Sequence, residues 1–210
     1  MLIQALAQEV HQNAVEHGWW DEERGLYEII ALIHSEWSEA LEEARADMPM
    51  AYIQLKHPEL SPNMVEIIPR GDDGKYTSEI GLSEGKSITD EKPEGIAVEL
   101  IDGVIRILDY YGKIGAQFDD PVTGLPSEIE SLYTDDDDVD VPNDVPTLIT
   151  LLHAITSRMV LEDDDDPSTL IEAMGTAMMW VKDRGIDPLA LLLEKHAYNK
   201  TRPYKHGKKF

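Results

Sequence analysis

A single stretch decides the fold of this chain: residues 96–111 read IAVELIDGVIRILDYY. Most of its positions are apolar, and a helix that is apolar on most sides is normally buried among other helices. One polar stripe interrupts the helix at spacings of three, four and three residues, formed by Glu99, Asp102, Arg106 and Asp109. The stripe has two interpretations: a solvent-facing edge, or a polar site inside a helical core.

A second helical stretch carries carboxylates at the same spacing. Within residues 27–44, apolar side chains recur at helical intervals, and Glu36 and Glu39 lie within or beside that apolar stripe. Residues three apart project from one face of a helix, so Glu36 pairs with Glu39 and Glu99 with Asp102. Buried ionised carboxylates are costly unless something compensates them. Four of them across two packed helices predict an oxygen-ligand site for a hard divalent cation, against the alternative of two solvated helix faces.

Composition limits the remaining options. The chain has 210 residues, which favours a single domain over 1–210, and it has no cysteine, which excludes disulfides and thiolate chemistry. Its formal net charge is -24, so its field repels nucleic acid, and we expect no direct nucleic-acid binding. The N-terminus has no basic region ahead of an apolar run, and no segment approaches membrane-spanning length. We therefore expect a cytoplasmic protein without a membrane partner.

The hydrophobic periodicity predicts an all-α fold, a helical bundle with two long irregular inserts. The expected helices cover residues 2–17, 26–46, 93–113, 145–161, 167–184 and 187–198, with Pro93 in the first turn of the third. The inserts cover about 48–92 and 114–144, and residues 64–69 are expected to form a short strand. Because the helices have more apolar surface than one neighbour can cover, we expect oligomerisation to complete the bundle, as a homodimer or homotetramer.

Positive charge gathers at the C-terminus. The tail, residues 195–210, holds six of the eighteen lysines and arginines. An acidic protein that handles phosphates needs local positive charge, which this tail and a bound metal ion would supply.

Three segments resemble the motifs of one known superfamily. Residues 34–43 read HSEWSEALEE, residues 99–109 read ELIDGVIRILD, and residues 195–209 read KHAYNKTRPYKHGKK. Their order and content are similar to the all-α nucleoside triphosphate pyrophosphohydrolases, which include MazG, the dimeric dUTPases and the dCTP pyrophosphatases. The resemblance covers about half of the chain. The first insert departs from the short connection that usually joins the two motif helices, which leaves the substrate preference open.

The resemblance implies hydrolysis of a (d)NTP to a (d)NMP and pyrophosphate. Glu36, Glu39, Glu99 and Asp102 would hold Mg²⁺, with Mn²⁺ as an alternative ion, and Glu36 or Glu39 would also act in catalysis by orienting the attacking water. In the tail, the expected phosphate ligands are Lys195, Arg202, Lys205 and His206, and Asn199 would bind sugar or phosphate.

Other residues keep two interpretations. Arg106 either pairs with Asp102 four residues earlier or contacts phosphate, and Asp109 is expected to be structural. His34 and His153 are expected to be packing or surface residues. The cluster Trp19, Trp20 and Trp37 is expected to belong to the core rather than to stack on a nucleotide base.

Two other function classes stay open: an acidic helical binding protein that imitates the DNA phosphate array, and a catalytically silent relative.

Overall fold

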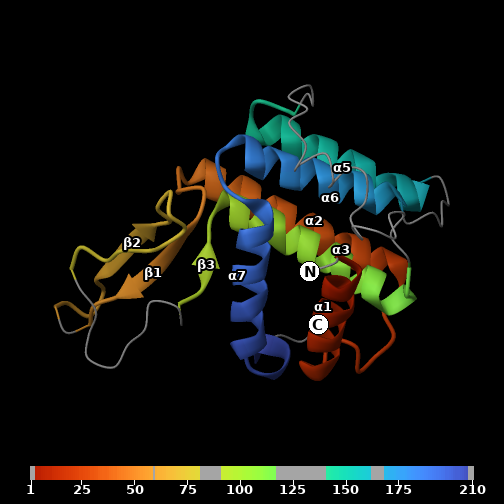
Figure 1. The fold of residues 1–210 in the computed structure, drawn as a ribbon, viewed down its shortest axis with the longest axis horizontal. Coiled ribbons are helices and arrows are strands. Elements are labelled where there is room, and N and C mark those ends of the chain that lie inside the picture. The colour runs from red at the N-terminus through yellow and green to blue at the C-terminus, as the bar shows by residue number, and fades with distance from the viewer. Residues whose placement is uncertain (1–2, 59, 81–90, 117–140, 162–167, 208–210) are drawn as a thin grey trace.

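Helix α3 (Ile96–Ile114) runs through the centre of the structure, as its apolar sequence predicts (Figure 1). This computed structural model describes residues 3–58, 60–80, 91–116, 141–161 and 168–207. Four other helices pack against α3: α1 (Ile3–Glu16), α2 (Leu26–Arg45), α6 (Ser168–Asp183) and α7 (Pro188–Thr201). A single chain therefore covers the helix whose apolar circumference suggested a partner chain, and the oligomeric state stays a prediction.

The helices form layers around α2 and α3. Helix α5 (Val145–Leu161) packs against both α2 and α6. Figure 1 shows α5 and α6 along one side of α2 and α3, with α1 and α7 on the opposite side. Fully buried residues from several layers, among them Ile33, Leu100 and Met174, form one continuous core.

The predicted helices are confirmed to within three residues at each end, but the start of α3 was wrong. Pro93 does not lie in the first turn of the helix. Instead, Pro93 and Glu94 form strand β3 (Pro93–Glu94), which pairs with Ile53 and Tyr52. Gly95, at φ 115°, separates this strand from the helix, a backbone conformation that is readily available only to glycine.

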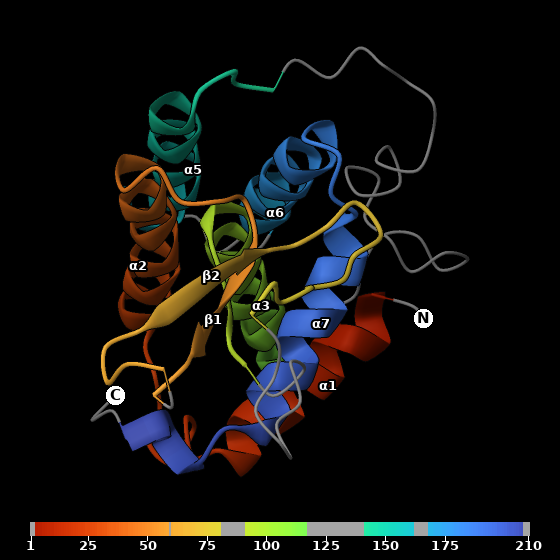
Figure 2. The same ribbon diagram turned by 90° about the vertical axis from the view of Figure 1, so that its left-hand side faces the viewer.

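The first insert is more regular than we expected. The strand predicted at 64–69 is confirmed as β2 (Val65–Pro69), and it pairs in antiparallel fashion with β1 (Tyr52–Lys56), which the sequence analysis missed. The sheet order is β2-β1-β3, so the fold is mostly helical, roughly as the all-α prediction has it, with a small three-stranded sheet added. Figure 2 shows the sheet beside α7.

Two side chains dock the insert on α7. Arg70 donates from Nε to Glu194 at 3.2 Å, and the Tyr76 hydroxyl donates to the same carboxylate at 2.6 Å. The insert is therefore fixed to the helix that also carries Lys195.

A close approach of α2 and α3 sets the position of the acidic residues. Trp37 of α2 is fully buried, and a Cβ atom at Gly103 of α3 would lie 2.1 Å from its indole nitrogen. Glycine is weakly disfavoured in a helix interior, but here it makes room for the indole ring. Because Trp37 follows Glu36 and Gly103 follows Asp102, this packing brings the two motif pairs together.

Two expectations fall partly outside the described residues: most of the second insert, residues 117–140, and the segment 162–167 between α5 and α6. Within the described part of the chain, no helix is long and apolar enough to cross a membrane.

Candidate metal centre

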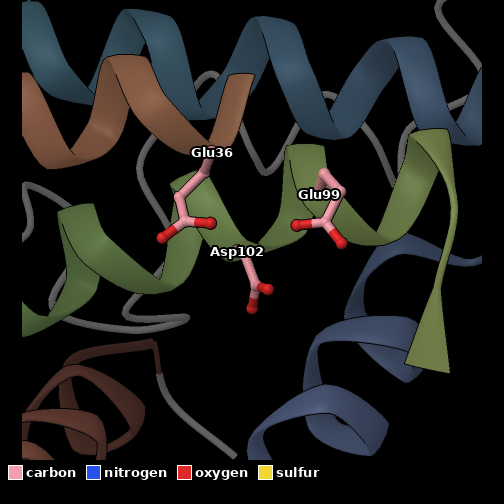
Figure 3. Close-up of side chains that lie close together, drawn as sticks. All are labelled: Glu36, Glu99 and Asp102. Atoms are coloured by element: carbon pink, nitrogen blue, oxygen red, sulfur yellow. The ribbon is translucent and has the colours of Figure 1, made fainter. Parts of the chain in front are cut away.

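Three of the four predicted ligands meet where α2 faces α3. Glu36 from α2 and Glu99 and Asp102 from α3 each offer a carboxylate oxygen, and these atoms lie within 4.8 Å of one another (Figure 3). Hard divalent cations bind oxygen at roughly 2.0 to 2.6 Å, so ligands on opposite sides of one ion are about 4 to 5 Å apart. The spacing of this acidic triad therefore fits a single Mg²⁺ or Mn²⁺.

The fourth predicted ligand lies outside the triad. Glu39 is on the same helix as Glu36 but is exposed, and it lines the wall of the adjoining pocket. Glu39 makes no ion pair with any described residue. An exposed carboxylate beside a metal site is suited to completing the coordination of the ion or to orienting a water molecule.

Three cations compensate the acidic triad. Arg106 donates from Nε at 3.0 Å and from Nη2 at 2.9 Å to the same Glu36 oxygen. Lys195 Nζ is 2.9 Å from an Asp102 oxygen, and Lys92 Nζ is 3.9 Å from a Glu99 oxygen. Each carboxylate of the triad thus has its own cation, which explains how the protein keeps three acidic groups in an apolar setting.

Burial changes the proton affinity of two triad members. Burial, followed by the neighbouring Asp102 charge, raises the pKa of Glu99 to about 8, although Lys195 and Lys92 act in the opposite direction. Burial also raises the pKa of Glu36, and Arg106 offsets part of that effect. A divalent ion that binds here at neutral pH therefore displaces a proton from Glu99.

The triad opens into a pocket of about 120 Å³. Typical ligand pockets measure roughly 300 to 1,000 Å³, so this one takes an ion and phosphate groups, while a whole nucleotide would extend through its open side. Residues from α1, α3 and α7, and from the turns that follow α1 and α7, complete the walls, among them Asn13, Trp19, Arg106, Asp109, His196, Asn199 and Arg202. The pocket thus joins the acidic triad to the start of the basic tail.

The residues predicted from the tail are distributed unevenly. Asn199 and Arg202 line the pocket, as a substrate-binding role requires. Lys195 is fully buried. Its ammonium group is compensated there, since it donates to the Pro93 carbonyl at 2.8 Å and pairs with Asp102. Lys205 pairs with Asp21 at 3.4 Å. The side chain of His206 lies outside the described residues, and phosphate contacts by Lys195, Lys205 and His206 stay predictions.

Sequence reasoning missed two features of the site. Lys92 was assigned to the insert, yet its ammonium group lies beside Glu99 and 3.1 Å from a Glu94 oxygen. These carboxylates raise the pKa of Lys92, although burial alone would lower it. Arg106 pairs across the helices with Glu36, rather than with Asp102 along its own helix. The only available signal for Lys92 was its position just before the motif helix.

Neighbouring residues have structural roles. Asp109 is buried and accepts hydrogen bonds from Trp20 Nε1 at 2.9 Å and from His11 Nδ1 at 2.8 Å, which ties α1 and the following loop to α3. His34 and His153 stack in parallel, with ring centroids 4.4 Å apart, between α2 and α5. These contacts agree with a structural interpretation of Asp109 and of both histidines, which stays a prediction.

Comparisons of the chain with family models, with curated proteins and with solved structures find no match in any of the three. The resemblance described above therefore rests on the motif residues alone and stays an expectation.

Proposed function

We propose that this protein is a Mg²⁺-dependent nucleoside triphosphate pyrophosphohydrolase, which cleaves a (d)NTP to a (d)NMP and pyrophosphate. One observation carries the proposal. Carboxylates from two separate motifs, Glu36 and the pair Glu99 and Asp102, come within 4.8 Å of one another at the wall of a pocket. That pocket continues to Asn199 and Arg202, the polar residues of the third motif.

In this proposal the acidic triad holds the ion, and Mn²⁺ is an alternative to Mg²⁺. The ion supplies charge neutralisation at the phosphate oxygens and a more acidic bound water. Glu39 orients the attacking water, since it lines the pocket without an ion pair to a described residue. Arg202 binds phosphate oxygens through its planar guanidinium group, and Asn199 hydrogen-bonds the sugar or a phosphate.

The charge balance of the site supports a role for the metal in anion binding. With Glu99 ionised, as ion binding requires, three carboxylates balance the three cations Lys92, Arg106 and Lys195. Adding a divalent ion makes the cluster positive, and the pocket then attracts phosphate despite the chain's formal charge of -24. The proposal therefore requires that nucleotide binding depend strongly on the metal.

The decisive experiment is a panel of ribo- and deoxyribonucleoside triphosphates with Mg²⁺, in which pyrophosphate and orthophosphate release are measured separately. We expect pyrophosphate and the monophosphate. Asp102→Asn and Glu39→Gln should each abolish metal-dependent turnover. The matched control is Glu42→Gln, on the same helix as Glu39. It changes an exposed carboxylate whose ion pair among the described residues is with Arg45.

Release of orthophosphate, or near-normal turnover by Asp102→Asn at saturating Mg²⁺, would refute the proposal. No turnover of any nucleotide would instead favour the alternatives, an acidic helical binding protein of the DNA-mimic type or a catalytically silent relative.

A homodimer or homotetramer is part of the proposal, although α3 no longer requires one. Its support is now the outer face of α5, where Leu151 and Leu161 are exposed. Light scattering at moderate salt tests it, and a monomer mass at micromolar concentration would contradict it.

A further inference from the structure

The end of α1 holds the turn that follows α7. His17 lies just beyond α1, and its Nε2 is 2.8 Å from the backbone carbonyl of Arg202. The backbone amide of Lys205 donates to the His17 carbonyl at 2.9 Å. Tyr204 adds a hydrogen bond from its hydroxyl to the Asp21 carboxylate. Three successive parts of the tail are therefore fixed to one short turn, residues 17–21.

Gly18 makes this contact possible. A Cβ atom at Gly18 would lie 2.3 Å from the Tyr204 ring, and its φ of 77° is in the left-handed region that favours glycine. The turn therefore needs glycine both for its own conformation and for the tyrosine that lies against it.

Both ring nitrogens of His17 face carbonyl oxygens. Nδ1 is 2.8 Å from the carbonyl of Asn13, and Nε2 is at the same distance from that of Arg202. A carbonyl only accepts hydrogen bonds, and a neutral imidazole carries a single N–H. Only the doubly protonated ring satisfies both contacts, because in the neutral ring one nitrogen lone pair would point at a carbonyl lone pair.

The surroundings suit a cation at this position. His17 lies at the C-terminal end of α1, where the helix dipole favours positive charge. Two ion pairs nearby, Glu9 with Lys200 and Asp21 with Lys205, balance their own charges. Charged and titratable groups on the described elements that meet at His17 include Glu9, His11, Glu16, Asp21, Glu194, Lys195, His196, Lys200, Arg202 and Lys205.

We infer that doubly protonated His17 is a positioning residue that clasps two walls of the pocket. The two backbone carbonyls that it joins belong to Asn13 and Arg202, and the side chains of both residues line the pocket. The clasp sets where Arg202 meets the substrate phosphates. The role of Arg202 toward substrate rests on the proposed function, whereas the clasp itself does not.

The clasp is tested first without any catalytic readout. In protein labelled with ¹⁵N-histidine, NMR should show both ring nitrogens of His17 protonated at mildly acidic pH. Hydrogen exchange of the Lys205 amide, which donates to the His17 carbonyl, should be slow in the natural protein. His17→Gln, which keeps only one donor group, should quicken it. His17→Lys, which keeps a cation with several donors, should restore part of the protection.

The consequence for substrate is tested with the nucleotide that the panel identifies. His17→Gln should raise KM about threefold to tenfold, the value of one lost hydrogen bond, with kcat retained. His17→Lys, which keeps a cation and several donors, should raise KM less than His17→Gln does. The matched control is Lys200→Gln, which changes the charge of the same region without touching the carbonyl of Arg202 and should leave KM within about twofold.

The outcomes separate the two proposals. A singly protonated His17 at mildly acidic pH, or exchange at Lys205 that is the same in His17→Gln, overturns the clasp even if the enzyme is active. Altered exchange with an unchanged KM overturns the positioning role. If no nucleotide is hydrolysed, the exchange and NMR results still decide whether the clasp exists.

Discussion

Two groups of ion pairs in this molecule use the same chemistry at very different depths. In the site, the side chain of Lys195 is fully buried and that of its partner Asp102 is 16% exposed. In the tail, Lys200 and its partner Glu9 are 45% and 42% exposed. Exposed pairs contribute little to stability, whereas a buried charge that loses its partner is strongly destabilising. The stability of this fold therefore depends more on how deeply its ion pairs are buried than on how many there are.

The largest expected effect comes from breaking the deepest pair. Lys195→Met removes the cation beside Asp102 and the donor to the Pro93 carbonyl, leaving both acceptors uncompensated. We expect the free energy of unfolding to fall by about 3 to 5 kcal/mol. Urea denaturation measures it. The double change Lys195→Met and Asp102→Leu should recover part of the loss, and a single variant as stable as the natural protein would contradict the comparison.

Next in size is the pH dependence of the acidic triad. Burial raises the pKa of Glu99 from its ordinary 4.5 to about 8, so the folded protein holds this proton more tightly than the unfolded chain. Stability from this group is complete below about pH 4.5 and is lost as the pH rises through 8, by roughly 1.4 kcal/mol for each pH unit between the two pKa values. Thermal unfolding of metal-free protein across this range measures the loss, which Glu99→Gln should reduce.

Bound Mg²⁺ should reverse this loss of stability at rising pH. The ion binds the ionised carboxylate, so the stabilisation that it gives should increase between pH 6 and about pH 8. Thermal unfolding with and without Mg²⁺ measures this difference. A shift in melting temperature that is independent of pH would show that Glu99 is not a ligand.

A third change separates backbone packing from charge. Gly103→Ala places a methyl group against the buried indole of Trp37, which moves α2 away from α3. The gain in helix propensity is about 1 kcal/mol, and overpacking costs about 1 to 3 kcal/mol, so we expect a net loss near 1 kcal/mol. The free energy of Mg²⁺ binding, measured by calorimetry, should fall by more than the free energy of unfolding, because the triad spans both helices. Unchanged affinity would mean that the approach of the helices does not set the site.

The smallest expected effect is in the tail. Lys200→Gln breaks the exposed pair with Glu9 and should change the free energy of unfolding by no more than about 0.5 kcal/mol, an effect that added salt removes. Denaturation at two salt concentrations measures it. A loss as large as that of Lys195→Met would remove the distinction between the two groups.

The sequence predicted what periodicity and local spacing determine. The helices follow from patterns a few residues long, and so does the place of Glu36, Glu99 and Asp102 within apolar helix faces. Cross-helix partners do not, because the choice of Arg106 between Asp102 and Glu36 depends on how far apart α2 and α3 pack. Strand β3 was missed because a proline before an apolar run also suits the start of a helix, and only its pairing with β1 decides.

Lys195 illustrates the same limit. Its position in a basic tail suggested a solvent-facing phosphate ligand, and nothing in the local sequence indicated full burial. That burial depends on β3, more than a hundred residues earlier, whose carbonyl at Pro93 accepts a hydrogen bond from the lysine.

This last contact has a consequence for how the chain can be shortened. The insert between the motif helices resembles a removable appendage, but its final residues build one wall of the metal centre. Excising the whole segment between α2 and α3 would delete Lys92 and the Pro93 carbonyl together, leaving Glu99 with one fewer neighbouring ammonium group and Lys195 with one acceptor instead of two. A shortened version of this protein must therefore keep residues 92–94 and replace the pairing with β1 that holds them in place. The metal centre thus depends structurally on the small sheet.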